Sequence, residues 1–354
     1  MKMPFRLLSL VAATAAGAIL MTGCGGTATN NAADANAGSG SDKQVTIYSA
    51  DGLGDWYSKT FAGFTKDTGI KVNVVEAGSG EVVSRAEKEK SNPQADLLIT
   101  LPPFIQMAEK DGLLQKNSAD TSAIPAESKS PDGMYVSLAN NYLTMIRNTA
   151  ATDKPDSWAQ LLDPKYQGKI QYSTPGQAGD GTAVLLLLQH LKGKDGALKY
   201  LADLQKNNVG PSASTGKLGP KVSKGELTVA NSDVQMALQS IQADKSAFEV
   251  FFPKNDDGSR VTLPLPYYMG LAANAPHEAS AAKLMDYLLS KPVQETISSS
   301  ALGLPSRSDV TPTDANYAAL KKTMDGVTVW TPNWNDVLSG LDSDVKAYNA
   351  ATGQ

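Results

Sequence analysis

Short apolar runs alternate with amphipathic segments over residues 44–112, and this alternation is the feature that most restricts the fold. Tyr57, Phe61 and Phe64 recur at helical spacing, and Gly69 follows them where a helix would end. Strands that alternate with helices in this way predict βαβ units and a mainly parallel sheet, so we assign the chain to the α/β class. The expected strands are 45–48, 70–75 and 95–100, and the expected helices are 55–68, 80–91 and 103–111.

Two long extended runs interrupt this alternation. Tyr135–Arg147 and Val261–Ala272 are each longer than an ordinary strand, and the second contains Pro264 and Pro266. We interpret both as strands that cross between two α/β lobes, with a ligand cleft between the lobes at the carboxyl ends of the strands. The remaining expected helices are 157–162, 180–191, 196–206, 232–243, 278–290, 291–300, 313–324 and 335–350, and the remaining strands are 169–172, 226–231 and 247–252.

The first 23 residues have the parts of a bacterial export signal. Lys2 and Arg6 supply a positive start, Leu7–Met21 is uncharged and mostly apolar, and small residues precede Cys24, the only cysteine of the chain. This pattern resembles a lipoprotein signal, in which cleavage before Cys24 is followed by acylation of its thiol. The alternative is an ordinary secretory signal with an incidental cysteine. We expect an exported protein, anchored by lipid at Cys24 on the periplasmic or cell-surface side of the cytoplasmic membrane.

Composition limits what the exported part can do. Residues 25–42 consist of Gly, Ala, Ser, Thr, Asn and Asp, which predicts a flexible tether. Loss of Lys2 and Arg6 with the signal leaves 30 basic and 36 acidic residues, a formal charge of −6, so no nucleic-acid partner is expected. His190 and His277 are the only histidines, which leaves no Ser–His, Cys–His or zinc constellation. We expect binding rather than catalysis, with no cofactor and no metal.

Four polar loops stand where predicted strands end and predicted helices begin. Each offers hydroxyl groups and small residues beside free backbone N–H groups, which together suit an anion without the help of an arginine. Taken singly, Ser, Thr and Asp in such places are also ordinary helix caps. The four loops are Ser49–Gly52, Gly78–Glu81, Ser173–Thr182 and Ser212–Lys217.

An aspartate and a tyrosine pair complete the candidate ligand contacts. Asp233 opens the predicted helix at 232–243, where it can cap the helix or meet a ligand cation. Tyr267 and Tyr268 lie on the second extended run, and strand alternation would turn one of them towards the cleft and the other away. Phenolate ligation of ferric ion and simple packing between the lobes are the two alternative roles for the tyrosine pair.

The loops belong to long contiguous motifs, which are Tyr48–Gly52, Glu76–Glu81, Gln94–Phe104, Gln171–Ala183, Asn207–Leu218, Leu265–Tyr268, Pro312–Tyr317 and Pro332–Trp334. Together they resemble the 2-aminoethylphosphonate-binding proteins of bacterial ABC importers, over nearly all of residues 44–353. The wider family includes ferric-ion-binding proteins with a two-lobed periplasmic-binding-protein fold. In these iron-binding relatives a tyrosine pair stands at the start of the helix after strand 226–231. Here that place reads Asn231-Ser232-Asp233-Val234-Gln235, which disfavours a ferric site.

The resemblance implies a ligand with two ends of opposite charge. Neutral hydroxyl and N–H donors suit the phosphonate of 2-aminoethylphosphonate, and a carboxylate suits its ammonium. Asp233 is the first choice for the ammonium and Asp51 the second, and Tyr267 or Tyr268 would line the cleft. The residues assigned to the phosphonate are Ser173, Thr174, Thr182, Ser214 and Thr215, with Ser49 and Ser79 from the opposite lobe.

The resemblance also implies the domain organisation and the partners. The expected parts are a signal peptide at 1–23, a tether at 24–43, the first part of lobe 1 at 44–138, lobe 2 at 139–266, and a return to lobe 1 with the C-terminal helices at 267–354. A monomer would deliver its ligand to an ABC permease in the inner membrane. The alternatives are the same fold binding phosphate, another phosphonate or a ferric–anion complex, and an exported enzyme that acts on phosphonates.

Overall fold

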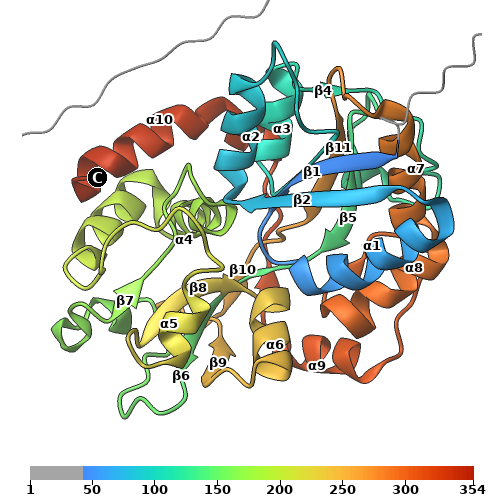
Figure 1. The fold of residues 1–354 in the computed structure, drawn as a ribbon. Helices are drawn as coiled ribbons and strands as arrows, with labels where there is room; N and C mark the ends of the chain where they lie inside the picture. The colour runs from blue at the N-terminus through green and yellow to red at the C-terminus, as the bar shows by residue number, and fades with distance from the viewer. Residues whose placement is uncertain (1–42) are drawn as a thin grey trace, which may run out of the picture. The chain divides into compact units, whose positions relative to one another are not determined.

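The computed structural model describes residues 43–354 (Figure 1). The predicted signal peptide, Cys24 and nearly all of the predicted tether lie outside the described residues. Among residues 43–354, none of the helices has the length and apolar character needed to cross a membrane. Two sheets, one of seven strands and one of four, organise this part of the chain.

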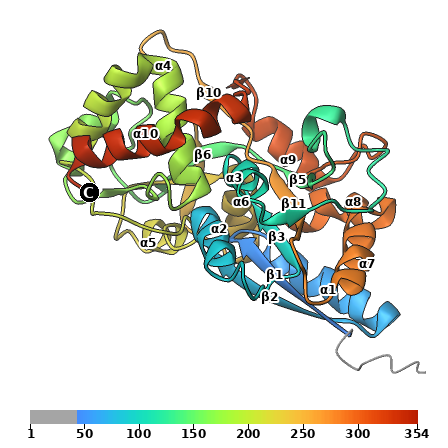
Figure 2. The ribbon, with the colours of Figure 1, turned by 90° about the horizontal axis from the view of Figure 1, so that it is seen from above.

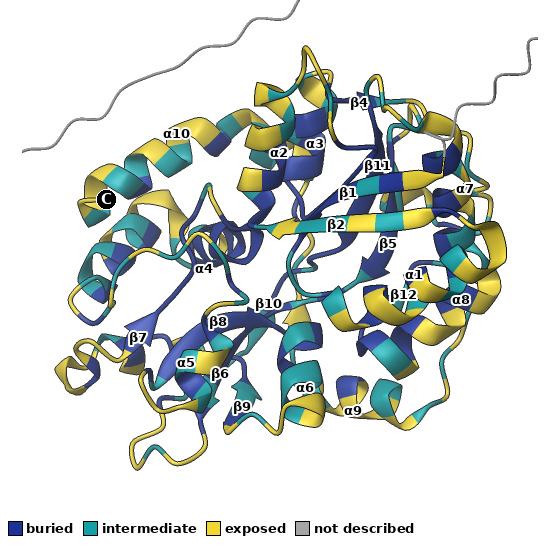
Figure 3. Ribbon diagram, in the orientation of Figure 1, coloured by how far each residue is buried: buried dark blue, intermediate teal, exposed yellow. Residues whose placement is uncertain are grey.

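The larger sheet begins with the expected βαβ units. Its strand order is β12-β5-β11-β3-β1-β2, with β4 paired to β11. Strands β1, β2 and β3 are parallel, and β2 is the edge strand, with alternating exposed and partly buried residues (Figure 3). The elements are β1 (Gln44–Ala50), α1 (Gly54–Thr68), β2 (Lys71–Ala77), α2 (Ser79–Lys88), β3 (Leu97–Thr100) and α3 (Phe104–Lys110).

The expectation of a mainly parallel sheet is wrong. Strand β11 runs antiparallel to β3, β4 and β5, and β12 runs antiparallel to β5. Strands β5 and β11 enter the sheet from the two extended runs rather than from βαβ units, so no crossover helix fixes them parallel to β3. The bounds of the four strands are β4 (Leu114–Gln115), β5 (Tyr135–Asn140), β11 (Tyr267–Ala272) and β12 (Leu304–Pro305).

The smaller sheet has the order β7-β8-β6-β9 and is also mixed, since only β7 and β8 are parallel. The two helices expected at 180–191 and 196–206 are both present and share the label α4 (Gly179–Leu204); they are separated at Gly193, whose φ of 71° and ψ of 166° are not helical. The helix expected at 157–162 is wrong: Gln160–Leu162 and Pro164–Tyr166 are single 3₁₀ turns. The other elements are β6 (Leu143–Asn148), β7 (Ile170–Gln171), α5 (Gly219–Ser223), β8 (Val229–Asp233), α6 (Val234–Ala243) and β9 (Phe248–Phe251).

The first extended run crosses from one sheet to the other, as predicted, and contributes β5 to the larger sheet and β6 to the smaller one. The second run contains β10 (Val261–Thr262), which pairs with β13 (Thr328–Val329) in a separate two-stranded sheet, and then β11 of the larger sheet. The crossings lie side by side: Leu143 N donates to Leu263 O at 3.1 Å, and Leu265 N donates to Asn141 O at 2.8 Å. The sheets are therefore joined by two hydrogen-bonded segments.

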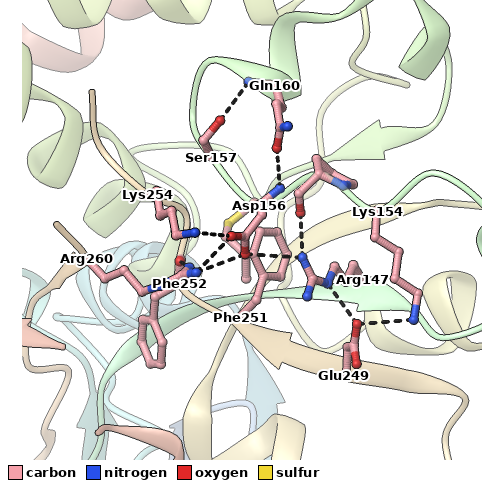
Figure 4. A network of polar contacts seen from close by, with 12 residues as sticks. Arg147, Lys154, Asp156, Ser157, Gln160, Glu249, Phe251, Phe252, Lys254 and Arg260 are labelled. Atoms are coloured by element: carbon pink, nitrogen blue, oxygen red, sulfur yellow. Dashed lines mark hydrogen bonds and ion pairs between the residues drawn. The ribbon is translucent and has the colours of Figure 1, made fainter. Parts of the chain in front are cut away.

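A network of charged side chains fastens the start of the second crossing to the smaller sheet (Figure 4). Arg260 Nη2 donates to both oxygens of Asp156, at 2.9 and 3.1 Å. Lys254 Nζ lies 3.0 Å and Arg147 Nη1 3.4 Å from the same carboxylate. Arg147 Nε also donates to Glu249, at 2.9 Å. We call Asp156 and its three cations, Arg147, Lys254 and Arg260, the Asp156 cluster.

The last C-terminal helix contacts one helix beside the larger sheet and one beside the smaller sheet. Helix α10 (Trp334–Thr352) packs on α3, which follows β3, and on α4, which it lies beside in Figures 1 and 2. Its Tyr348 hydroxyl lies 2.9 Å from that of Tyr172, and Lys194 Nζ donates to Asp344 at 2.7 Å. The assignment of 267–354 to lobe 1 stays a prediction. The other elements are α7 (Glu278–Leu289), α8 (Lys291–Thr296), α9 (Ala315–Thr323) and β13 (Thr328–Val329).

Candidate functional site

Loops that follow the strands of both sheets meet at one place. Gly80 N, in the first turn of α2, donates to Gln177 O at 2.9 Å, in the loop before α4. A Cβ atom on Gly78 would overlap the Ala213 carbonyl oxygen, so only glycine allows the two loops to approach this closely. Three of the four predicted loops, 78–81, 173–182 and 212–217, are thus in mutual contact.

Asp51 joins the remaining loop to this group. It follows β1, and its Oδ2 accepts hydrogen bonds from Ser214 Oγ at 2.5 Å and from Gly216 N at 2.9 Å. These donors belong to the loop that the sequence assigns to the phosphonate. The structure therefore brings Asp51, one of the two candidates for the ammonium, against two donors of the opposite sheet.

Asp233 is the last residue of β8 and the N-cap of α6. Its Oδ1 accepts a hydrogen bond from Met236 N at 2.6 Å, which is the capping role considered from the sequence. The residue is fully buried. Burial raises the pKa of Asp233 to about 6, against the lowering effect of the Asn141 side chain and the Met236 N–H.

Tyr267 lies between Asp51 and Asp233. Its hydroxyl is 3.1 Å from Asp51 O and 3.3 Å from Asp233 Oδ2. Gly52 has φ +126°, and a Cβ atom there would overlap this hydroxyl, so glycine makes room for the contact. Tyr268 points to the other face of β11, where its ring packs edge-on against Tyr135 at 4.9 Å between centroids. The expected alternation thus directs Tyr267 to the aspartates.

Asp180 is a third carboxylate here, and the sequence reasoning missed it. It lies in the first turn of α4, is 3 % exposed, and its Oδ2 accepts a hydrogen bond from Thr215 Oγ1 at 3.1 Å. Its Oδ1 has no hydrogen-bond partner. Burial, followed by the charges of Asp233 and Asp51, raises its pKa well above the ordinary value. Its place between Gly179 and Gly181 in a polar loop was the available signal.

Two of the predicted hydroxyl donors, Thr215 and Ser173, form a chain of contacts that starts at Asp180. Thr215 Oγ1 lies 2.9 Å from Ser173 Oγ, and Ser173 N donates to Asn231 Oδ1 at 2.8 Å. Asn231, which ends the expected strand at 226–231, was not singled out from the sequence. Ser173, Thr215 and Asp180 thus form one continuous polar row, all buried.

The remaining predicted donors contact other groups of the protein. Thr182 Oγ1 accepts from Gly176 N and donates to Ala178 O, both at 2.9 Å. Thr174 Oγ1 accepts from Ser212 N at 3.0 Å. Ser49 Oγ donates to Ala50 O at 2.8 Å and lies 2.9 Å from Tyr57 Oη. Ser79 is buried at the start of α2 and abuts Gly179, where a Cβ atom would lie 2.7 Å from Ser79 Oγ.

The three aspartates share the absence of a positively charged neighbour. Within residues 43–354, none of Asp51, Asp180 and Asp233 forms an ion pair with a Lys, Arg or His side chain. The same part of the chain contains no group of three or more His, Cys, Asp or Glu side chains arranged to hold a metal ion. We call Asp51, Asp180 and Asp233, with Tyr267 and Thr215, the carboxylate site. It can stabilise a cation beside hydroxyl donors.

The model of the family described as bacterial extracellular solute-binding protein matches residues 92–339. The chain belongs to this family. It is 47% identical over 325 residues to the Salmonella typhimurium protein named "Putative 2-aminoethylphosphonate-binding periplasmic protein", covering 90% of this chain and 95% of the relative. The resemblance read from the motifs is confirmed at this level.

Proteins of lower sequence identity are also similar to this chain. The Fe(3+)-binding periplasmic protein of Serratia marcescens is 23% identical, over 72% of this chain and 76% of its own. The solved structure of the periplasmic binding protein AfuA from Actinobacillus pleuropneumoniae has a TM-score of 0.71 at 20% identity, covering 87% of this solute-binding protein and 97% of AfuA. The ferric binding protein from Campylobacter jejuni has a TM-score of 0.70 at 21% identity, covering 87% and 99%. These likenesses confirm the predicted periplasmic-binding-protein fold.

Proposed function

We propose that this solute-binding protein captures 2-aminoethylphosphonate and delivers it to the permease of an ABC importer. The observation that carries the proposal is the carboxylate site, where three aspartates without an ion pair adjoin a row of hydroxyl groups. Such a site suits a ligand with an ammonium at one end and an anion at the other. The name of the Salmonella relative supports the same ligand.

The two ends of the ligand would meet different residues. The phosphonate would accept hydrogen bonds from Ser173, Ser214 and Thr215, which adjoin the aspartates, and from the other predicted donors after their present bonds are exchanged. The ammonium would meet the carboxylate site, for which the sequence names Asp233 first and Asp51 second, and Tyr267 would line the site. The donor set for the phosphonate is Ser49, Ser79, Ser173, Thr174, Thr182, Ser214 and Thr215.

The proposed function also specifies where the protein is located, how it is attached to the membrane and how it binds its ligand. The chain would be exported, acylated at Cys24 and held by the tether at the cytoplasmic membrane, where a monomer of two lobes would close on its ligand. Binding without turnover is supported by the two histidine rings, which are engaged elsewhere: His190 stacks on Trp330 at 4.1 Å between ring centroids, and His277 Nδ1 lies 3.1 Å from Asp96 Oδ2.

Titration calorimetry of the purified chain tests the ligand. We expect tight binding of 2-aminoethylphosphonate and much weaker binding of inorganic phosphate, because phosphate has no cation for the aspartates. Phosphate binding more tightly than 2-aminoethylphosphonate would overturn the proposal. Turnover of 2-aminoethylphosphonate, followed by phosphorus NMR, would instead identify an enzyme.

A further inference from the structure

The three aspartates of the carboxylate site differ in how far their oxygens are engaged. Both oxygens of Asp233 lie within hydrogen-bond distance of a donor, and one oxygen of Asp51 accepts two hydrogen bonds. Asp180 uses Oδ2 alone. Among the side chains of residues 43–354, its Oδ1 is the one buried carboxylate oxygen without a hydrogen-bond partner. Since buried polar groups are nearly always paired, we infer that a group outside the chain donates a hydrogen bond to this oxygen.

Asn141 lies in the same surroundings. It is 1 % exposed, and its side chain lowers the pKa of Asp233 as a hydrogen-bond donor to that carboxylate. Asp180 Oδ1 is therefore the acceptor that is left for a donor of the ligand, which favours a polar ligand over an apolar one.

The charges that face Asp180 are all negative. Asp233 acts on it from the junction of β8 and α6, and Asp51 from the turn after β1. From β11 it is faced by the neutral hydroxyl of Tyr267, and from the loop before α5 by that of Thr215. A buried carboxylate in such surroundings is costly unless a cation joins it.

We propose that Asp180 Oδ1 is the atom that receives the ammonium of the ligand, with Asp233 adding negative charge behind it. The inference rests on the proposed function, because it names the partner of the ammonium within the same site. Thr215 Oγ1 supports it, since that hydroxyl lies 3.1 Å from Asp180 Oδ2 and 2.9 Å from Ser173 Oγ. The hydroxyl row for the phosphonate therefore begins beside Asp180, as a ligand with only two carbons between its charges requires.

Asp180→Asn is the direct test, because the amide keeps the size of the side chain and removes its charge. We expect calorimetry to show an affinity for 2-aminoethylphosphonate lowered about 100-fold. The affinity for ethylphosphonate, which has the same two carbons but no amine, should change less than about threefold. Asp195→Asn, an exposed aspartate on the same helix, is the matched control and should leave both affinities unchanged.

The outcomes separate this inference from the proposed function. Unmodified protein that fails to bind 2-aminoethylphosphonate would overturn both. If the unmodified protein binds it, an Asp180→Asn variant that binds it equally well, or that loses both ligands equally, would overturn the role of Asp180 alone.

A second test of the role of Asp180 uses the unmodified protein, so it does not depend on whether a variant folds. The pKa of Asp180 is raised well above its ordinary value by burial and by the neighbouring aspartates, and an ammonium beside Oδ1 would lower it again. Binding of 2-aminoethylphosphonate should therefore release more protons than binding of ethylphosphonate, after each value is corrected for the titration of the ligand's own phosphonate. Calorimetry in buffers of different ionisation enthalpy, repeated over a range of pH, gives both numbers. Equal corrected proton release for the two ligands at every pH would overturn the proposal.

Discussion

Asp156 and Asp233 belong to the same α/β protein but lie in opposite surroundings. Asp156 is partly exposed, and Arg260, Lys254 and Arg147 surround it. Burial alone would raise its pKa, but hydrogen bonds and charges from Arg260 and Lys254 lower it below the ordinary value. Asp233 is buried without an ion pair, and its pKa is raised to about 6. The first carboxylate is neutralised within the chain, and the second is not.

The presence or absence of paired cations indicates which carboxylates are available to a ligand. The Asp156 cluster fastens the second crossing to the smaller sheet and has its cations already in place. The carboxylate site joins loops of both sheets and has none. A cationic ligand gains most binding free energy beside carboxylates that the protein has not already paired with cations. The carboxylate site is therefore a better candidate for ligand binding than the Asp156 cluster.

Neutralising the carboxylate site by substitution should give the largest effect. Asp233→Asn keeps an N-cap for α6, since Asn caps as well as Asp, but removes the charge. We expect the affinity for 2-aminoethylphosphonate to fall about 100-fold, or about 2.7 kcal/mol, with little change for ethylphosphonate. Calorimetry with both ligands measures this. Equal losses for the two ligands would show that the substitution damages the site generally and would contradict the electrostatic role.

Acid should have the next largest effect on binding. With a pKa of about 6, Asp233 is mostly ionised at pH 7 and mostly protonated at pH 5, so the affinity for 2-aminoethylphosphonate should fall about tenfold between these values. Ethylphosphonate is the control, and each affinity is first corrected for the titration of that ligand's own phosphonate, because the ammonium lowers the phosphonate pKa of 2-aminoethylphosphonate. A ratio of the corrected affinities that stays constant from pH 7 to pH 5 would contradict the prediction.

The raised pKa of Asp233 and the lowered pKa of Asp156 make the stability of the fold depend on pH in opposite directions. Because the folded-state pKa of Asp233 is raised, its contribution to the free energy of unfolding declines as pH rises from about 4 to about 6. The pKa of Asp156 is lowered, so its stabilising contribution is complete above about pH 4 and is lost as pH falls below that. Urea unfolding of Asp233→Asn should therefore lack part of the decline between pH 4 and pH 6. A pH profile identical to that of the unmodified protein would exclude this role.

Removal of one hydroxyl should have a smaller effect. Tyr267→Phe removes the group that lies 3.3 Å from Asp233 Oδ2, and we expect a loss of about fivefold, or about 1 kcal/mol, in affinity for 2-aminoethylphosphonate. Tyr268→Phe, the next residue along the same strand but facing the other way, is the matched control. The comparison fails if Tyr268→Phe weakens binding as much as Tyr267→Phe does.

The Asp156 cluster should affect stability alone, and only slightly. Asp156→Asn leaves three cations without their shared carboxylate, but these side chains are partly exposed and screened by water. We expect a loss of about 1 kcal/mol in the free energy of unfolding, measured in urea, and an unchanged affinity for 2-aminoethylphosphonate. A large loss of affinity would mean that fastening of the crossing, and not only the carboxylate site, controls recognition.

Local patterns in the sequence predicted much of the fold. Period and composition identified β1–β3 and their helices, and the length of the two extended runs identified the crossings. They did not predict that β11 lies antiparallel to β3, because pairing depends on segments far apart in sequence. The two helices expected at 180–191 and 196–206 are both present, because the non-helical backbone of Gly193 separates them within α4.

The candidate site was predicted in part for a similar reason. Asp233 and Tyr267 were named from their places at a helix start and on a strand, and the structure brings them together. Asp180 could not be distinguished from a helix cap, because its significance depends on Asp51 and Asp233 from other segments. The sequence also gave no sign that Ser214 would bond to Asp51 of the opposite sheet.

The position of α10 bears on the mechanics of any closing motion. This helix packs on α3, beside the larger sheet, and on α4, above the smaller one, with Tyr348 bonded to Tyr172. Rotation of one sheet against the other must therefore either slide α10 over one of its two neighbours or carry it away from one of them. Opening would expose apolar surface at that contact as well as separating the polar loops. The contacts of the nineteen-residue helix α10 with both α3 and α4 would therefore resist such a rotation.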